Sequence, residues 1–380
     1  MSSITLTDEQ NRAKKEFFEW FDNFKLNYSK RYWFCAGYAG VGKSTISRFI
    51  LDELNSKGKS ACCCTFTGKA SVNFREKTGY ESNTIHSTIY KPVINKDGQV
   101  VDWKLNHYDS PILSSDLILI DEISMVYKDL WNDLLTYNKP ILVFGDLAQL
   151  PPVNNEMLFT EDNVDFRLTK IHRQALENPI IRLSIDVRNG KDIPYGNFDN
   201  KVLKVRRDEF DIKNILKFDQ ILCGRNITRT ELNQFMRNML GYTTKLPGLN
   251  EKLICLRNNR ETGTFNGQIL NTLTGVLKQD KKRGTFDIKL DYDEGYSNTF
   301  TIFDDEFLRE KIREDRWKIL KNNPWFCQFD YSYCVSCHKA QGSEWNNVCI
   351  FDESYCFRED RWRWLYTGIT RAKDKLLIIK

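Results

Sequence analysis

The segment Gly37-Tyr38-Ala39-Gly40-Val41-Gly42-Lys43-Ser44 fits the pattern G-x-x-x-x-G-K-[ST] between a predicted strand and a predicted helix. Its glycines let consecutive backbone N–H groups turn inward around phosphate oxygens, beside the positive end of the following helix. We expect Lys43 to reach the β and γ phosphates and the Ser44 hydroxyl to ligate Mg²⁺. A chance glycine-rich turn is the alternative, and strand, loop and helix in register argue against it. The residues assigned to binding ATP are Gly37, Gly40, Val41, Gly42, Lys43, Ser44 and Thr45.

Two acids follow the apolar run Leu117 to Ile120. A strand of this kind delivers Asp121 to the carboxyl edge of a sheet, where it can hold Mg²⁺ through water, and Glu122 beside it can polarise an attacking water. By itself, an apolar strand followed by two acids usually shows only that the strand has reached solvent. Downstream of a phosphate-binding loop, the same pattern favours a catalytic pair of acids. A carboxylate after the Mg²⁺ aspartate points to hydrolysis of ATP rather than transfer of phosphate to a hydroxyl.

An amide stands after the next apolar run, in Phe144-Gly145-Asp146-Leu147-Ala148-Gln149-Leu150-Pro151-Pro152-Val153. Gln149 lies at the edge of the same expected cleft, where it could sense the γ-phosphate and pass its presence to the following segment. A strand-terminating turn stiffened by two prolines is the alternative. Beside the phosphate loop and the acid pair, we favour the sensor.

The elements that must position these groups alternate between helix and strand. Thr7-Asp8-Glu9-Gln10 opens an amphipathic helix predicted to about Lys25. Continuous apolar strands separated by helices are typical of a parallel sheet covered on both faces. The predicted segments are the strands Tyr32 to Ala36, Ala61 to Phe66, Leu117 to Ile120 and Ile141 to Phe144, and the helix Ser44 to Leu54.

Two insertions interrupt this rhythm. Tyr90 to Leu113 is expected to form a hairpin, with its turn at Lys96-Asp97-Gly98. From Gly275 to about Phe326 short alternating strands, Thr285 to Leu290 and Asn298 to Phe303, precede a charged helix around Glu306 to Leu320. We therefore expect a first lobe at 1–172 with a hairpin at about 90–113, a second lobe at 173–274 and 327–380, and an accessory insertion at 275–326.

The second lobe is expected to repeat the α/β alternation from about Arg173 onward. Its predicted segments are the strands Gln220 to Cys223, Lys252 to Leu256, Tyr333 to Ser336, Val348 to Phe351 and Leu376 to Ile379, and the helices Arg229 to Leu240 and Arg361 to Thr370.

Composition is compatible with this plan. The chain has 380 residues, 41% hydrophobic and 28% charged, which suggests two or three packed domains. With 56 Lys and Arg against 51 Asp and Glu, the formal charge is +5, so a polyanionic partner is permitted but not demanded. No run approaches the roughly 18 apolar residues of a membrane span, and the start MSSITLTDEQ lacks a secretory layout, so we expect the cytosol of its host and no membrane partner.

The cysteines number 11 and sit mostly inside apolar stretches, as reduced, buried thiols would. Cys334-Val335-Ser336-Cys337-His338 formally matches the pattern for c-type haem attachment. No export signal accompanies it, and no second cysteine pair is spaced to complete a zinc site. We therefore expect neither haem nor zinc.

In order and spacing, nine segments resemble the motifs of superfamily 1 helicases, in particular the 1B branch of RecD-like and Dda-like enzymes, over nearly the whole chain except the two insertions. The resemblance implies an α/β fold of two RecA-like, parallel-sheet P-loop lobes with ATP between them. It also implies a small hairpin insertion in the first lobe and a β-rich insertion in the second that weakly resembles an SH3-like domain. The segments are Leu6–Gln10, Gly37–Ser44, Thr65–Ala70, Thr84–His86, Asp121–Met125, Gly145–Val153, Leu168–Gln174, Val335–Trp345 and Trp364–Ala372.

The resemblance also assigns roles in the ATP site. Gln10 would recognise adenine, although Thr7 and Gln10 equally have the spacing of a helix capping box, and both can hold at once. Arg173 and Arg371 would act as arginine fingers, because a guanidinium spreads charge over developing phosphoryl oxygens. Glu344 would bind the ribose.

For nucleic acid, the resemblance implies hydroxyl and basic contacts that ignore base sequence. An internal hydrogen bond is an equally weighted alternative for His86 and His338. In the hairpin, Trp103 or Tyr90 could stack on a base at the point where a duplex is separated. Along the phosphates the resemblance places Thr67 and Lys69 on one lobe and Ser336 and His338 on the other, with Thr84 and His86 nearby.

The sequence departs from the family pattern at three places. Phe66 stands where the family usually has proline, and Ser336 replaces the usual threonine but keeps a hydroxyl. The second insertion is acidic at Asp291-Tyr292-Asp293-Glu294, so we assign it no grip on DNA.

We expect a monomeric, ATP-dependent helicase or translocase that moves 5′ to 3′ on single-stranded DNA and acts at duplex junctions, with replication or recombination proteins as further partners. Two alternatives stay open: a nucleotide-gated DNA-binding or loading protein, and a P-loop kinase. The kinase reading leaves Glu122, Gln149 and the whole C-terminal lobe unexplained. Strand displacement and ATP turnover without a phosphate acceptor distinguish the three.

Overall fold

A computed structural model provides the structure. It describes residues 5–26, 30–94, 100–152, 157–171, 177–257, 259, 262, 264, 266–293, 296–305, 307–309, 323 and 325–380, with backbone alone at 92, 94, 100–103, 292, 293 and 296. The chain divides into two compact units. The first comprises Met1–Lys91, Trp103–Asp192 and Trp362–Thr370; the second comprises Pro92–Asp102, Ile193–Arg361 and Arg371–Lys380.

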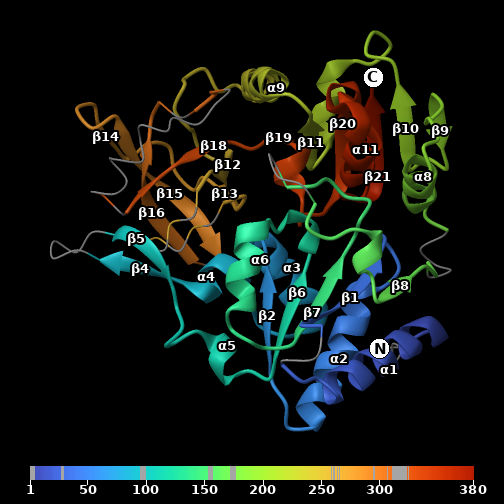
Figure 1. Cartoon of the computed structure of the whole chain (residues 1–380). Helices are drawn as coiled ribbons and strands as arrows, with labels where there is room; N and C mark the ends of the chain where they lie inside the picture. Colours follow the sequence, from blue (N-terminus) through green and yellow to red (C-terminus); the bar gives the residue numbers. More distant parts are fainter. Residues whose placement is uncertain are drawn as a thin grey trace. The chain divides into compact units, whose positions relative to one another are not determined.

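A six-stranded, wholly parallel sheet forms the centre of the first unit (Figure 1). Its strand order is β3-β2-β6-β7-β1-β8. The α/β class with a parallel-sheet core is therefore confirmed. The strands are β1 Tyr32–Gly37, β2 Ala61–Thr65, β3 Ser82–Thr84, β6 Leu117–Asp121, β7 Ile141–Gly145 and β8 Phe166–Leu168.

Helices cover both faces of this sheet, as its continuous apolar strands require. On one face Phe17, Ile46 and Phe74 from α1, α2 and α3 pack with strand residues such as Cys35. On the other face helices α4, α5 and α6 pack against the alternate strand residues. The helices are α1 Asp8–Asp22, α2 Lys43–Ser56, α3 Gly68–Thr78, α4 Ile85–Ile89, α5 Pro111–Ser114, α6 Lys128–Leu135, α8 Pro179–Arg188 and α11 Arg361–Ile369, with 3₁₀ turns at Ile123–Met125 and Glu161–Asn163.

The segment expected to form a hairpin contains a two-stranded sheet of β4 Tyr90–Ile94 and β5 Val100–Leu105. The expected turn at Lys96–Gly98 lies outside the described residues. Residues 92–102 group with the second unit and the rest of the segment with the first.

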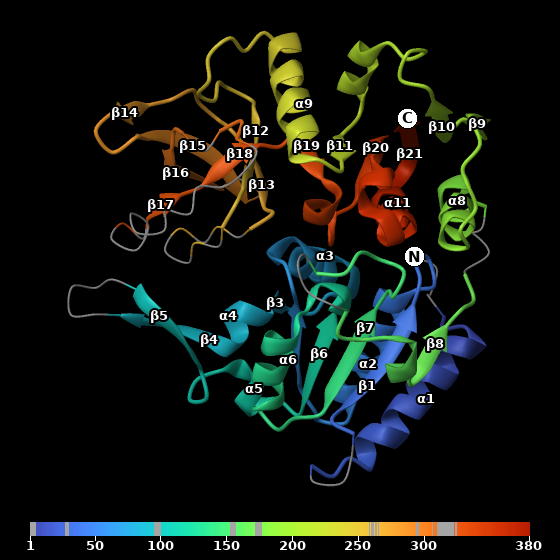
Figure 2. The same ribbon diagram turned by 45° about the horizontal axis from the view of Figure 1, so that its top comes forward.

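The second unit contains another six-stranded sheet, ordered β19-β11-β20-β21-β10-β9 (Figure 2). All its pairings are parallel except that of β9 with β10. Its elements are β9 Gly196–Phe198, β10 Val202–Val205, β11 Gln220–Cys223, β19 Cys334–Ser336, β20 Trp345–Phe351, β21 Ala372–Ile379 and helix α9 Asn226–Met239, with 3₁₀ turns at Ile212–Lys217, Cys337–Ala340 and Ser354–Asp360.

Two antiparallel-rich sheets complete the second unit, ordered β13-β12-β18 and β14-β15-β16-β17. An isolated bridge between Thr272, which follows β13, and Leu290 of β15 connects the two sheets. The expected charged helix at 306–320 falls largely outside the described residues. The strands are β12 Lys252–Cys255, β13 Ile269–Asn271, β14 Lys278–Asp280, β15 Thr285–Asp293, β16 Tyr296–Phe303, β17 Phe326–Cys327 and β18 Phe329–Tyr331.

The expected limits of the accessory insertion, 275–326, are too narrow. Strand β12, expected in the second parallel sheet, instead pairs antiparallel with β13 and β18. Leu253 of β12 and Phe329 of β18 share one apolar core with Phe286 and Phe300. The β-rich part therefore extends over about residues 252–331, because β12 pairs with β13 and β18 and their apolar residues share a core cluster with those of β15 and β16.

The expected limit between the lobes, at residues 172 and 173, also differs from the compact units. The first unit continues through α8 to Asp192 and includes Trp362–Thr370, which were expected in the second lobe. A contact on α8 accounts for the first extension: the Arg188 guanidinium lies 3.4 Å from the centre of the Tyr38 ring in the phosphate loop. Side chains of α11 account for the second, because Arg363 donates to the Leu147 carbonyl and Tyr366 accepts the Ala39 N–H.

Among the described helices, none combines the length and apolar character that crossing a membrane requires. All 11 cysteines are free thiols; ten are buried and Cys356 is exposed.

A buried ion pair anchors α9 to the β-rich part of the second unit. Arg237 is 1% exposed and Glu251 is fully buried. The guanidinium donates two hydrogen bonds to the carboxylate, with Nε–Oε1 at 2.7 Å and Nη2–Oε2 at 3.0 Å. The Gly248 N–H and the Tyr333 hydroxyl also donate to Glu251. Such a pair is costly to break, because removing one charge strands the other in an apolar core.

We predict that Glu251→Gln lowers the free energy of unfolding by about 3–5 kcal/mol, since Arg237 loses its counter-charge. Glu209→Gln is the matched control, because Glu209 pairs with Arg206 at the surface, where both side chains are more than half exposed; it should cost under about 1 kcal/mol. Urea unfolding of the full chain measures both. Equal effects would show that the buried pair adds nothing special.

Candidate active site

The phosphate loop joins β1 to α2, as its motif requires. Gly40 and Gly42 adopt φ of 83° and 81°, which side chains rarely tolerate. A Cβ at Gly37 would lie 2.7 Å from Val41 Cγ2, so the tight loop excludes one there as well. The Lys43 ammonium donates to the carbonyls of Gly37 and Tyr38, at 2.8 and 3.1 Å. Lys43 is thus held over the loop that it is expected to serve.

Neighbouring strand ends gather the predicted catalytic groups. Strands β6, β7 and β1 are adjacent and parallel, so their carboxyl ends share one edge of the sheet (Figure 2). Asp121 ends β6, Gly145 ends β7, and the phosphate loop follows β1. Only glycine fits at 145, since a Cβ would lie 2.4 Å from Ile123 Cγ2. Three segments expected from sequence therefore meet at this edge.

The two acids at the end of β6 are held close together. Burial and the neighbouring Glu122 carboxylate raise the pKa of Asp121 to about 6. The Glu122 N–H donates to Asp121 Oδ1 at 3.0 Å, and Glu122 adopts a left-handed conformation with φ 59° and ψ 51°. A non-glycine residue in this region is uncommon and is often found at functional sites. A partly buried carboxylate next to a second one favours a bound cation.

The side-chain oxygen of Gln149 is buried without a hydrogen-bond donor among the described residues. Gln149 as a whole is 3% exposed. A buried polar atom without a partner is costly and is seldom left so without a reason. Its place after β7 is consistent with a partner from outside the chain, such as a nucleophilic water or a Mg²⁺-bound water.

The helix that begins at Thr7 is tied to the phosphate loop. The expected capping box is present: Gln10 N donates to Thr7 Oγ1, and Thr7 N donates to Gln10 Oε1. The Gln10 amide also donates from Nε2 to the Val41 carbonyl at 3.1 Å. The structural interpretation of Gln10 is therefore correct, and adenine recognition stays a prediction.

Glu9 was not singled out from sequence, yet it is a further anchor. It accepts hydrogen bonds from the backbone N–H groups of Thr169 and Lys170 and from the Thr169 hydroxyl. Burial alone would raise the pKa of Glu9, but these hydrogen bonds lower it. Glu9 therefore holds, as an anion, the segment that leads toward Arg173. The sequence feature that could have indicated Glu9 is an acidic residue at the start of a helix. Such a residue ordinarily indicates only a favourable interaction with the helix dipole.

Asp146 and Tyr366 were also missed as site residues. Each is 1% exposed. The Tyr366 hydroxyl donates to Asp146 Oδ2 at 2.6 Å and accepts the Ala39 N–H of the phosphate loop at 2.9 Å. Burial raises the pKa of Asp146, while Lys43 and the hydrogen bond from Tyr366 counteract that rise. Because Tyr366 lies more than 300 positions from Ala39, no local pattern could reveal the contact.

The two residues predicted as arginine fingers and the residue predicted to bind the ribose are not among the described residues of the first unit. Arg173 lies outside the described residues. Arg371 and Glu344 belong to the second unit. There Arg371 is buried and donates to the Ser343 carbonyl, while Glu344 lies 3.6 Å from the Lys373 ammonium. Their roles in ATP binding stay predictions.

The hydroxyls expected along nucleic acid share one structural role: each caps a helix start. Thr67 accepts from Ala70 N, Thr84 from Ser87 N, and Ser336 from Lys339 N. Capping uses a hydroxyl lone pair. For Thr67 it leaves the O–H free to donate to a phosphate oxygen, whereas the Thr84 hydroxyl already donates to Ser87 Oγ. Lys69, in the first turn of α3, forms no ion pair with described residues.

The two predicted histidines have internal partners. His86 Nε2 lies 3.3 Å from the Tyr127 hydroxyl, and its ring packs against Phe66 and Tyr90. His338 stacks near Phe357, with 5.5 Å between ring centres. Burial lowers the pKa of His338, which favours the neutral ring, whose N–H group can donate to a phosphate oxygen. Trp103 lies in β5, and its side chain is outside the description.

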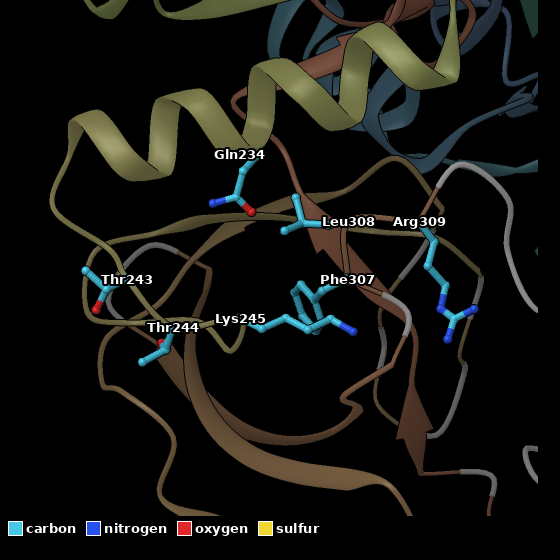
Figure 3. Close-up of a pocket in the computed structure, with 7 residues that line it drawn as sticks. All are labelled: Gln234, Thr243, Thr244, Lys245, Phe307, Leu308 and Arg309. Atoms are coloured by element: carbon cyan, nitrogen blue, oxygen red, sulfur yellow. The ribbon is translucent and has the colours of Figure 1, made fainter.

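A separate pocket of about 400 Å³ lies in the second unit, and none of the predicted site residues lines it. Figure 3 shows Gln234 reaching into it from α9, with Lys245 extended beside Phe307. The lining residues are Gln234, Thr243, Thr244, Lys245, Phe307, Leu308 and Arg309.

Comparison with known proteins gives concordant results. Residues 24–155 match the family model described as an AAA domain, and residues 331–379 match the UvrD-like helicase C-terminal domain. The ATP-dependent RecD2 DNA helicase of Deinococcus radiodurans is 26% identical over 367 residues, covering 89% of this chain and 45% of that protein. The ATP-dependent DNA helicase dda of Enterobacteria phage T4 is 27% identical over 251 residues, covering 61% of this chain and 50% of that protein.

The fold has a counterpart among solved structures. The crystal structure of Bacteroides Pif1 bound to ssDNA superposes with a TM-score of 0.57 at 17% identity, covering 99% of this chain and 92% of that one. The chain spans about half the length of the curated relatives that it matches. The phosphate loop, the acid pair and the segment around Gln149 lie at one sheet edge, and the matched models and relatives make the chain similar to the superfamily 1B helicases of the RecD, Dda and Pif1 type.

Proposed function

We propose that the chain is an ATP-driven DNA helicase that moves 5′ to 3′ along single-stranded DNA. One observation carries the hydrolytic part: the buried Gln149 amide, whose oxygen accepts no hydrogen bond from the described residues, shares a sheet edge with the phosphate loop and with Asp121 and Glu122. These groups can position a water molecule for attack on the phosphate of a bound nucleotide. Two relatives named as ATP-dependent DNA helicases support the same activity.

The residues at this edge divide the chemistry. Backbone N–H groups after Gly40 and the Lys43 ammonium bind phosphate oxygens, for which Lys43 must leave the carbonyls of Gly37 and Tyr38. Ser44 and Asp121 would hold Mg²⁺, which neutralises charge on the phosphates. Glu122 accepts a proton from the attacking water, and Gln149 orients that water. Arg173 and Arg371 are proposed to stabilise the charge that develops.

DNA binding is proposed to use both units. Thr67 and Lys69 on the first unit and Ser336 on the second would contact phosphates, at helix starts where the backbone dipole favours anions. Such contacts ignore sequence and weaken in salt. Because the same chain binds ATP and the strand, ATP turnover can change its grip in steps and so produce directed movement.

The two alternatives make different demands. A P-loop kinase needs an acceptor hydroxyl, so its phosphate transfer would stop without one, whereas the proposed enzyme releases phosphate into water. A nucleotide-gated loading protein would bind DNA and turn over ATP without displacing a strand. The acid pair and Gln149 disfavour the kinase; only an unwinding assay separates the loading protein.

We predict that Glu122→Gln retains ATP binding but releases phosphate at least about 100-fold more slowly, since the water loses its base. Phosphate release with excess single-stranded DNA and titration with a fluorescent ATP analogue measure the two effects. Lys43→Ala should instead weaken the binding itself. Glu19→Gln, on the exposed face of α1, is the control and should behave as wild type. Normal turnover in Glu122→Gln would remove this carboxylate from the mechanism.

Polarity is tested with a labelled duplex that carries a 5′ or a 3′ single-stranded overhang. We expect ATP-dependent displacement of the labelled strand with the 5′ overhang alone. A blunt duplex and the Lys43→Ala variant provide the background. Displacement only from the 3′ overhang would reverse the proposed direction, and none from either substrate, with intact DNA-stimulated ATPase, would favour the loading protein.

We predict that Trp103→Ala in β5 impairs duplex opening several-fold more than ATPase stimulated by single strands, because loss of a stacking group costs about 1–3 kcal/mol per base. Both rates are measured on one preparation. Trp325→Ala, at an exposed tryptophan outside the hairpin, serves as the control. Equal loss of both activities in Trp103→Ala would place the residue in the fold or the strand track instead.

A further inference from the structure

One face of α11 is bonded to the segment that carries Gln149. The Thr367 hydroxyl accepts the Leu150 N–H at 3.0 Å, and Arg363 donates to the carbonyls of Leu147 and Gln149 at 2.5 and 3.3 Å. Tyr366 lies on the same face, since positions 363, 366 and 367 are one helical turn apart. All these contacts lie within the first unit. Helix α11 therefore fixes the backbone that presents Gln149.

Tyr366 adds a second link, to the phosphate loop. Its hydroxyl accepts from Ala39 N and donates to Asp146 Oδ2, so a single oxygen joins the third residue of the loop to the second residue of the Gly145–Leu150 segment. Asp146 in turn accepts from the Ala148 N–H at 3.0 Å. Within the first unit this connects both elements expected to face the γ-phosphate.

We propose that Tyr366 is a positioning residue of the ATP site, which holds Ala39 and Asp146 in fixed register through its hydroxyl group. The proposal rests on the proposed function, because it concerns the same hydrolytic site. Tyr366 itself touches no reacting atom.

The geometry separates two effects of losing the hydroxyl. The Ala39 N–H points to Tyr366, so it is not one of the N–H groups left to bind the phosphates of ADP. Removing its acceptor should therefore leave ADP affinity nearly intact. Asp146, and with it Gln149, should be held less precisely relative to the phosphate loop. Small displacements of catalytic groups slow turnover strongly. A merely structural tyrosine would lower stability without this split.

The test compares Tyr366→Phe with Tyr137→Phe. Tyr137 is also buried in the first unit, and its hydroxyl donates to the carbonyls of Ile89 and Asn106, away from the phosphate loop. We expect Tyr366→Phe to lower the turnover number for ATP about 10- to 100-fold with saturating DNA, while the Kd for fluorescently labelled ADP changes less than about twofold. Tyr137→Phe should leave both unchanged, even if its thermal midpoint falls.

Asp146→Asn provides a second, independent variant, because asparagine keeps the shape but has one acceptor oxygen where the Tyr366 hydroxyl and the Ala148 N–H require two. Its turnover should also fall with ADP affinity retained, and the double variant with Tyr366→Phe should be no slower than the slower single variant. Wild-type turnover in Tyr366→Phe or in Asp146→Asn would overturn the proposal, as would multiplicative effects in the double variant. A wild-type chain that releases no phosphate would refute the proposed function instead.

Discussion

The parallel pairing of β6, β7 and β1 is the constraint on which the rest depends. In a parallel sheet the carboxyl ends of neighbouring strands lie at one edge, so three separate motifs are delivered together without any loop having to reach. The Asp121–Glu122 pair, the Gly145–Leu150 segment and the phosphate loop occupy three adjacent strand ends. The tight fit of Gly145 against Ile123 shows how closely these ends approach.

Around this edge, buried polar contacts replace the apolar packing of the rest of the unit. Gln10 holds the Val41 carbonyl, Glu9 holds the segment at Thr169, and Tyr366 joins Ala39 to Asp146. Such groups are costly to bury unless they are satisfied, and satisfied networks specify one geometry. The Gln149 side-chain oxygen is an exception, because it is buried and accepts no hydrogen bond from the described residues.

The proposed DNA contacts show how one group can serve fold and function. Thr67 and Ser336 stabilise the helices that they start, so their presence has a structural reason before any ligand is considered. His86 and His338 are likewise packed among aromatic rings. Residue type alone therefore could not separate a cap or a core histidine from a phosphate contact, and the structure gives each a local role without excluding the second.

The sequence by itself determined the features that short stretches encode. The phosphate loop, the apolar strands before it and before Asp121, and the capping box at Thr7 are all local patterns, and they were found where predicted. Tertiary structure alone decided that β12 joins an antiparallel sheet, that α8 and most of α11 belong to the first unit, and that Tyr366 bonds to Ala39. These outcomes depend on which distant surfaces bury one another, and an apolar strand or an amphipathic helix carries no record of its partner in its own periodicity.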